Sequence, residues 1–418
     1  MLRRLANDDS TRPPKRRTQA TLQRAVRGLA AAVGLLALVA CQSVAPRSDH
    51  SSEVIFRFAT VGDSRQQPGQ AGNSAQDERW LQATPVWARM LSEIEQQRPQ
   101  ALIFNGDMIY GYHRDLAAVD REYAFWRGMV AGLMQRGTYV LPVPGNHEVQ
   151  WAVPRPDGAS PPGRPNGEAL NAKQEAAPVS PRRAVVAKEQ AWRANMGDLI
   201  VDAEMWQRLT HQPLTAWQRD HAPTAASDGV LTDQRQLSYS FDSAGLHFAV
   251  INTDPVGLDA SAPVAWLRAD LAAARARGVK RSFVFGHKPA FTYRPHPQPA
   301  TAAKAAADGI DSRPALRDAF WEVIEAFGAV YFCGHQHVYD ASQPRLASGG
   351  KAWQIIVGTA GTPLSFAGDR SPHVKDRMFA WADVAVQRNG RVQVQVWGFE
   401  APDQPTRLLE RLDIAATD

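Results

Sequence analysis

The sequence contains very little cysteine: only Cys41 and Cys333 occur among its 418 residues. So few cysteines cannot form the disulfide framework that stabilises small secreted scaffolds, which excludes that class of protein. Cys333 ends a short apolar run that predicts a buried strand. We therefore interpret Cys333 as a small buried hydrophobic side chain.

A long apolar run is also missing from the N-terminal region. Residues 28–40 are apolar and carry no charge, but they are too few to cross a bilayer comfortably as a helix. The run follows a basic segment, which is typical of a secretion signal over residues 1–40. It ends in Leu38-Val39-Ala40-Cys41, which resembles the lipobox of bacterial lipoproteins. The resemblance implies acylation of Cys41; an ordinary signal peptide followed by a chance cysteine is the alternative.

The chain beyond this leader has no marked excess of charge. The net charge of +5 alone would suggest nucleic acid or a membrane surface as a partner. Residues 1–40 contain eight basic and two acidic side chains, a net of +6, so the remaining chain carries about −1. We therefore expect no nucleic-acid partner. Gln42 stands where an aspartate would signal inner-membrane retention, so we expect residues 41–53 to tether the protein to the periplasmic face of the outer membrane.

Predicted strands and helices alternate along the rest of the chain, which indicates an α/β core with much parallel sheet. We expect the core to comprise residues 54–150 and 237–418. The predicted strands are 54–61, 101–104, 138–143, 237–241, 246–251, 283–285, 329–333, 354–357, 378–387 and 392–396. The predicted helices are 80–97, 122–135, 265–277 and 315–327.

Residues 151–236 interrupt this core. Proline, glycine, alanine and asparagine dominate up to about residue 182, which predicts a mobile insertion. Residues 184–217 have a helical pattern. They form either a cap over the functional site or a surface decoration, and the sequence leaves both open.

Polar residues with metal-binding side chains directly follow the predicted strands. In open α/β sheets, sites are built at the carboxyl ends of strands. One such residue is unremarkable, but agreement at six strand or loop ends is not a chance event. The residues are Asp63, Asp107, Tyr110, Asn146, His147, His287, His335 and His337.

This series resembles the calcineurin-like metallophosphoesterases. The motifs are Gly62-Asp63, Gly106-Asp107, Gly145-Asn146-His147-Glu148, Gly286-His287 and Gly334-His335-Gln336-His337, within residues 54–364. The resemblance implies two mixed β-sheets packed as a sandwich and flanked by helices. It also implies a phosphoesterase that uses two metal ions.

The first motif departs from the usual Asp-x-His of this family, because Arg65 stands at the histidine position. Arginine stays protonated and cannot serve as that ligand. Gly106-Asp107-Met108-Ile109-Tyr110 resembles the variant motif of purple acid phosphatases, in which a tyrosine replaces the histidine. A core aromatic side chain is the alternative for Tyr110. We expect Arg65 either to contact the phosphate of the substrate or to form a salt bridge to the insertion.

The resemblance implies two ligand sets that share Asp107. The first consists of Asp63, Asp107, Tyr110 and His337, and the second of Asp107, Asn146, His287 and His335. A phenolate favours Fe(III), so iron paired with iron, zinc or manganese is expected. Two such ions clamp the oxygens of an in-line displacement and provide hydroxide as the nucleophile.

In the family the histidine after the asparagine ligand assists the leaving group, a role that falls on His147. Glu148 is expected to orient its imidazole. Asn146, His147 and Arg65 are candidate substrate contacts. The predicted activity is hydrolysis of phosphate monoesters or diesters. The alternatives are a phosphodiesterase for nucleotides or lipid head groups, and a degenerate lipoprotein that binds metal or phosphate without turnover.

Overall fold

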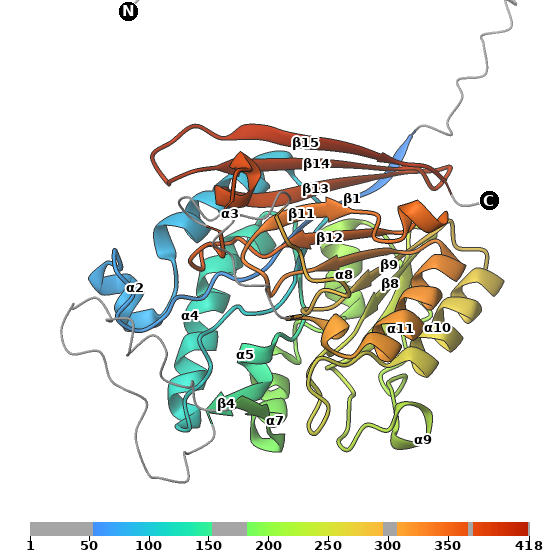
Figure 1. Cartoon of the computed structure of the whole chain (residues 1–418), viewed down its shortest axis with the longest axis horizontal. Coiled ribbons are helices and arrows are strands. Elements are labelled where there is room, and N and C mark those ends of the chain that lie inside the picture. The colour runs from blue at the N-terminus through green and yellow to red at the C-terminus, as the bar shows by residue number, and fades with distance from the viewer. Residues whose placement is uncertain (1–52, 153–181, 296–306, 367–370, 417–418) are drawn as a thin grey trace, which may run out of the picture. The chain divides into compact units, whose positions relative to one another are not determined.

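The computed structural model describes residues 53–152, 182–295, 307–366 and 371–416 (Figure 1). The predicted signal peptide, Cys41 and the tether up to residue 52 lie outside the described residues, as do residues 153–181 of the predicted insertion. No helix among the described residues is long and apolar enough to span a membrane.

One mixed sheet has six strands in the order β15-β14-β13-β1-β2-β3. Strands β1, β2 and β3 are parallel, and β13 pairs antiparallel with β1. The bounds are Val54–Val61 (β1), Ala101–Phe104 (β2), Tyr139–Pro142 (β3), Phe379–Gln387 (β13), Val392–Phe399 (β14) and Arg407–Ile414 (β15). The parallel strands belong to the first half of the chain, as the alternation of strands and helices predicts.

The other large sheet has seven strands in the order β11-β12-β10-β9-β8-β7-β6. Strands β8, β9, β10 and β12 are parallel, and an antiparallel hairpin joins β7 to β8. The bounds are Leu214–Thr215 (β6), Tyr239–Ser243 (β7), Leu246–Val250 (β8), Arg281–Phe285 (β9), Val330–Cys333 (β10), Tyr339–Ser342 (β11) and Trp353–Val357 (β12). A small third sheet pairs β4 (Gln150–Ala152) with β5 (Arg182–Ala184).

The two large sheets pack face to face through aromatic side chains. Phe58 of β1 lies with its ring centroid 5.2 Å from that of Phe283 and 5.8 Å from that of Phe332 in the other sheet. Rings at such separations and steep angles attract one another beyond their area of contact. All three are fully buried in one core cluster. The predicted sandwich of two mixed sheets is therefore confirmed.

Helices cover the outer faces of the sandwich, with α3 and α4 on the left and α10 and α11 on the right in Figure 1. A separate core cluster lies beneath α10 and α11 and contains Cys333, which is fully buried as expected. The helices are α2 (Ala75–Trp80), α3 (Thr84–Gln97), α4 (Leu116–Gln135), α5 (Asn146–Val149), α7 (Val186–Met196), α8 (Ala203–Thr210), α9 (Ala225–Asp228), α10 (Val264–Ala276) and α11 (Pro314–Phe327), with 3-10 turns at Ile310–Ser312, Leu346–Ser348 and Val374–Arg377.

Two predicted helices are each divided in the structure. The expected helix 80–97 begins only at Thr84, because α2 ends at Trp80 and Leu81 adopts a left-handed conformation. The helical pattern of 184–217 separates into α7 and α8, with a cap at the start of α8 where Asp202 accepts a hydrogen bond from the Met205 amide. Trp206 of α8 is fully buried against core aromatics, so α8 contributes to the main core.

Candidate metal centre

The predicted metal-binding side chains come together where the ends of strands from both large sheets meet. Asp63 and Asp107 follow β1 and β2, Asn146 begins α5 after β3, and His287 and His335 follow β9 and β10. The amide of Asp63 donates to the carbonyl of Gly106, and the amide of His335 donates to Asp63 Oδ2 at 3.0 Å. The site thus forms at the carboxyl edges of the parallel strands.

Three of these residues have backbones in the left-handed region. The φ angles are 65° for Asp63, 54° for Asp107 and 69° for His335. Such angles are uncommon for residues other than glycine, and the surrounding structure must enforce them. The conformation turns each chain sharply at a strand end.

The glycines that precede these residues leave room for the ligand side chains. A Cβ atom on Gly334 would lie 2.3 Å from Asp63 Oδ2, and a Cβ atom on Gly106 would lie 2.6 Å from His287 Nδ1. Both separations are shorter than real Cβ contacts. The glycines of the motifs are therefore required by close approach, with Gly106 also at a φ of +86°.

Four donor atoms converge at the second predicted ligand set. His287 Nε2 lies 3.1 Å from Asp107 Oδ1 and 3.0 Å from Asn146 Oδ1. His335 Nδ1 lies 3.0 Å from Asn146 Oδ1 and 3.2 Å from His287 Nε2. Carboxylate, amide oxygen and imidazole are ligand types that zinc, iron and manganese accept.

Hydrogen bonds to the outer atoms of this set leave lone pairs facing one another. His287 Nδ1 donates to the carbonyl of Asn105 at 2.7 Å, so its Nε2 carries no proton in the neutral ring. The Asn146 amide nitrogen donates to the Tyr112 hydroxyl at 2.5 Å, so Oδ1 faces the histidines. Acceptors that meet in a buried place are stabilised by a proton or a cation between them. The residues of this set therefore fit a metal ion. His287 has the usual arrangement of a histidine ligand, because its second ring nitrogen donates to a backbone carbonyl.

Three of the four residues of the first predicted set also gather, although their contacts are wider. Asp63, Asp107 and His337 each offer a ligand atom within 4.8 Å of the others. His337 Nδ1 donates to the carbonyl of Pro363 at 2.9 Å, which directs the free Nε2 toward Asp63 Oδ1, 3.6 Å away. Asp63 Oδ1 is buried and has no hydrogen-bond partner. An unpaired buried carboxylate oxygen is consistent with a cation site.

The pKa values of these groups have the pattern expected of such a cluster. Burial raises the pKa of Asp63 to about 8. Burial lowers the pKa of His287, but the charge and hydrogen bond of Asp107 outweigh it and bring that pKa to about 10. In the absence of another cation, a proton on His287 therefore neutralises the cluster in part.

Arg65 lies inside the first set. Its side chain is almost fully buried, with Nε 3.4 Å from Asp107 Oδ2 and Nη2 3.4 Å from His337 Nε2. The sequence leaves a phosphate contact or a salt bridge to the insertion open for this residue. The structure pairs Arg65 with Asp107, and a contact with substrate phosphate stays a prediction.

His147 is held at the edge of the centre by a backbone atom. Its Nδ1 donates to the carbonyl of Tyr110 at 2.5 Å, and its Nε2 lies 3.7 Å from Asp107 Oδ2. Burial holds the pKa of His147 well below its usual value, with Arg65 as a further cause. The imidazole is therefore neutral in the protein without substrate.

The expectation that Glu148 orients the His147 imidazole is wrong. The Glu148 carboxylate accepts hydrogen bonds from the backbone amides of Gly145, Asp107, Met108 and Ile109. These four donors use its acceptor capacity, so Glu148 fixes the loop that carries Asp107. The Tyr110 carbonyl orients the imidazole in its place.

The half-buried ring of Tyr110 lies against the rings of Tyr112 and His113, 5.5 Å and 5.3 Å away. Burial raises the pKa of its phenol above the usual value. The role of Tyr110 as a metal ligand stays a prediction. Tyr112 is a further functional candidate, because its hydroxyl accepts a hydrogen bond from Asn146 and so positions that residue. The sequence motifs do not include Tyr112, although it lies only two residues beyond Tyr110.

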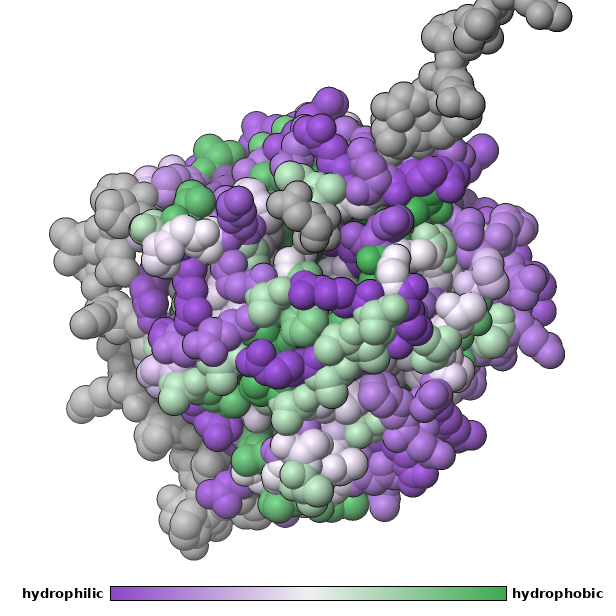
Figure 2. All heavy atoms as spheres, turned by 90° about the vertical axis from the view of Figure 1, so that its right-hand side faces the viewer, coloured by the Kyte–Doolittle hydropathy of each residue, from purple (hydrophilic) through white to green (hydrophobic). Residues whose placement is uncertain are grey.

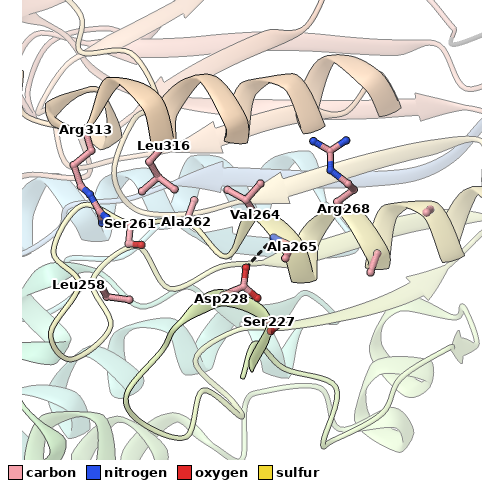
Figure 3. A pocket seen from close by; sticks show the side chains of 12 residues that line it. Ser227, Asp228, Leu258, Ser261, Ala262, Val264, Ala265, Arg268, Arg313 and Leu316 are labelled. Carbon is pink, nitrogen blue, oxygen red and sulfur yellow. Dashed lines mark hydrogen bonds between the residues drawn. The ribbon is translucent and has the colours of Figure 1, made fainter. Parts of the chain in front are cut away.

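A separate hollow of about 670 Å³ lies between α9, α10 and the start of α11, and none of the predicted site residues lines it (Figure 3). Arg268 and Arg313 approach it from opposite ends, and Asp228 accepts a hydrogen bond from the Ala265 amide. In Figure 2, the side of the molecule that includes α10 and α11 has apolar patches in green between hydrophilic residues in purple. This hollow is distinct from the metal centre.

Residues 57–339 match the calcineurin-like phosphoesterase family, and the chain belongs to that family. The match spans every strand end that contributes to the centre and confirms the enzyme class that the motifs predict, a metallophosphoesterase. Among curated proteins, none matches the chain.

Several solved structures are similar to the chain at low sequence identity. A purple acid phosphatase from yellow lupin (Lupinus luteus) seeds is 11% identical, with a TM-score of 0.49, over 86% of this chain and 53% of that one. The chain thus spans about half the length of the lupin enzyme. A dimetal phosphatase from Danio rerio is 17% identical, with a TM-score of 0.43, over 87% of this chain and 100% of that one. GAP50, the anchor in the inner membrane complex of Plasmodium, is 10% identical, with a TM-score of 0.44, over 87% of this chain and 89% of that one.

Proposed function

We propose that the chain hydrolyses phosphate monoesters or diesters with two metal ions at this centre. The observation that carries the proposal is the meeting of ligand atoms from Asp107, Asn146, His287 and His335 at separations of 3.0–3.2 Å. Atoms of these types in this arrangement fit a metal ion, and the family to which the chain belongs supplies the reaction class.

The ions would be held by Asp63, Asp107, Tyr110 and His337 at the first position and by Asp107, Asn146, His287 and His335 at the second. When bound, two ions supply the charge that activates water and stabilises the phosphoryl oxygens. Asp107 contributes to both positions, because its Oδ1 faces His287 and its Oδ2 faces the side of His337 and Arg65. A tyrosine ligand favours Fe(III) at the first position, with iron, zinc or manganese at the second.

The side chain of His147 assists the leaving group in this proposal. The Tyr110 carbonyl fixes its Nδ1–H, so its Nε2 is the atom that exchanges a proton. Burial favours the neutral ring, and the negative charge of a bound phosphate ester would raise the pKa of the ring and favour its protonated form. Protonation of the departing oxygen then follows the usual course of general acid catalysis.

A protein that binds metal or phosphate without turnover is the second candidate. The contact of Arg65 with Asp107 and His337 favours this alternative, because it replaces a metal–ligand contact at the first position. Hydrolysis separates the two candidates directly. A phosphodiesterase for nucleotides or lipid head groups is a narrower form of the first proposal.

The test measures bound metal and hydrolysis in the same preparation, against a panel of phosphate monoesters, nucleotide diesters and lipid head-group diesters. We expect the metal-loaded wild type to hydrolyse at least one class, and Asn146→Ala to lose both the second ion and turnover. Asn195→Ala is the matched control. The Asn195 side chain donates to Asp120 of α4 and to the Ala191 carbonyl of α7, and neither is a predicted metal ligand. Metal-loaded wild type that hydrolyses no ester would support the binding protein instead.

We further propose that the protein is exported and anchored by lipid on Cys41 at the periplasmic face of the outer membrane. The lipobox-like end of the apolar run supports this, because acyl chains would be its anchor. Cys41→Ser should release soluble or unprocessed protein in cell fractionation. Wild type found in the cytosol would contradict the proposal.

A further inference from the structure

Arg65 occupies the space toward which the first ligand set is directed. We propose that its guanidinium is the resident cation of the first metal position, so that the protein binds one ion firmly at the second position and a further ion only weakly. The proposal rests on the proposed function for its two positions. It assigns Arg65 the role of limiting how far the centre is loaded.

Arg65 contacts two of the four residues that would hold a first ion. Its Nη2 faces His337 Nε2 at 3.4 Å, and its Nε faces Asp107 Oδ2 at 3.4 Å. Both partners present lone pairs, since His337 Nδ1 donates elsewhere. A guanidinium is always charged and only donates, so it satisfies the same acceptors that a metal ion would.

The backbone of Arg65 is fixed at this place. Its amide donates to the carbonyl of Asp107 at 3.3 Å, and its carbonyl accepts from Thr362 Oγ1 at 2.7 Å. A short bridge also pairs Arg65 with Gln82. The side chain is only 7% exposed. The guanidinium is therefore built into the centre and is not a surface group that happens to approach it.

The two carboxylate oxygens of Asp107 face different groups, one toward Arg65 and the other toward the second metal position. Arg65 contacts Oδ2, whereas His287 and the rest of the second set face Oδ1. The second position is therefore complete while Arg65 stays in place. A metal ion at the first position would instead lie in contact with the guanidinium, and like charges at such a distance repel strongly in a buried site.

The test loads the full chain with Mn(II), removes free ions by dialysis, and counts the ions that remain. Electron paramagnetic resonance then distinguishes an isolated Mn(II) from an exchange-coupled pair. We expect about one isolated ion in the wild type. In Arg65→Gln, a second ion should bind about 10–100-fold more tightly than in the wild type and give the coupled spectrum.

Two further variants keep the test decisive if Arg65→Gln does not fold. Arg65→Lys retains the charge and should keep the wild-type count, whereas Arg65→His supplies an imidazole and should bind two ions. Arg57→Gln is the matched control, because Arg57 forms an ion pair with Asp383 in the six-stranded sheet and should leave the count unchanged.

A wild type that holds a coupled pair, or Arg65 variants that all keep the wild-type count, would overturn the proposal. The ion count does not depend on turnover. If the counts follow expectation while no variant hydrolyses an ester, the proposed function fails and the role of Arg65 stands.

Discussion

The backbone amide of His335 donates a hydrogen bond to Asp63 Oδ2 over 3.0 Å, and this contact joins the two large sheets. Asp63 follows β1 of the six-stranded sheet, and His335 follows β10 of the seven-stranded sheet. Each sheet supplies only part of the donor set. The centre therefore assembles only when the sandwich is packed, and changes to one side chain can alter contacts on both sheets.

Asp107→Ala should remove the ion of the second position, prevent loading of the first position and abolish hydrolysis. The Asp107 carboxylate is buried and faces the second set with Oδ1 and the first set with Oδ2. Metal analysis and a turnover assay check this result. Asp383→Ala, which removes another buried carboxylate, should keep its metal. A variant at Asp107 with two ions and normal turnover would mean that the ligand assignment is wrong.

His147→Ala should leave metal content unchanged and reduce turnover by roughly 10²–10⁴-fold, the range for a lost general acid. The loss should shrink for esters with good leaving groups, because these need less protonation. A series of aryl phosphates of graded leaving-group pKa measures this dependence. An equal loss across the series would indicate a binding or structural role for His147.

Tyr110 and Tyr112 should act on different ions. Tyr112→Phe removes the hydroxyl that accepts from Asn146 and should weaken second-ion binding by about 10–100-fold. Tyr110→Phe keeps the ring but removes a phenolate ligand, so it should bleach any colour that iron-loaded protein owes to charge transfer. Metal titration and visible absorption compare the two variants. Colourless iron-loaded wild type, or unchanged metal affinity and rate in Tyr110→Phe, would make Tyr110 a core aromatic residue.

His247 should make stability depend on pH. Its ring nitrogens lie 2.7 Å from Asp242 Oδ1 and 2.8 Å from Asp270 Oδ2, and these carboxylates also contact Arg277 and His221. Burial lowers the pKa of His247, but hydrogen bonds to both carboxylates outweigh it, and the net pKa is raised. The imidazolium therefore stabilises the fold fully below the unfolded pKa of about 6.5, and this contribution is lost as pH rises through the folded pKa.

The free energy of unfolding of wild type should thus exceed that of His247→Gln most near pH 5–6. The difference should decline toward pH 9, by at most about 1.4 kcal/mol per pH unit. Urea unfolding of both proteins across this range measures it, and pH effects common to both cancel. A constant difference for His247→Gln would contradict the buried imidazolium.

The sequence predicts those parts of the fold that have a strong apolar pattern. The run Ala101–Phe104 is uniformly apolar and buried, and its bounds are the predicted ones. Strand β15, with the sequence RLLERLDI, is not predicted, because this edge strand buries only two of its residues and its charged residues interrupt the apolar pattern. Helix α2 is also missed, since its six residues are mostly polar and depend on the Ser74 cap.

The sequence predicts the candidate site only for residues whose positions are determined by the ends of strands. Motif order predicts that Asp63 lies near Asp107 and His287 near His335, because the parallel strands before each pair are neighbours in one sheet. The contact between Asp63 and His335 depends instead on the packing of the two sheets. Motif order does not say where long side chains reach, so neither the contact of Arg65 with His337 nor the amide bonds of Glu148 follow from spacing. Tyr112 carries no motif signal, and only its hydrogen bond to Asn146 identifies it.

Ion binding and ester hydrolysis can be followed together while metal is returned to chelated protein. We expect metal-free protein to be inactive and turnover to rise with the number of ions bound. His287→Ala should fail to recover, because it lacks a ligand of the second ion. Full turnover by metal-free protein, or full recovery by His287→Ala, would contradict the assignment of this centre.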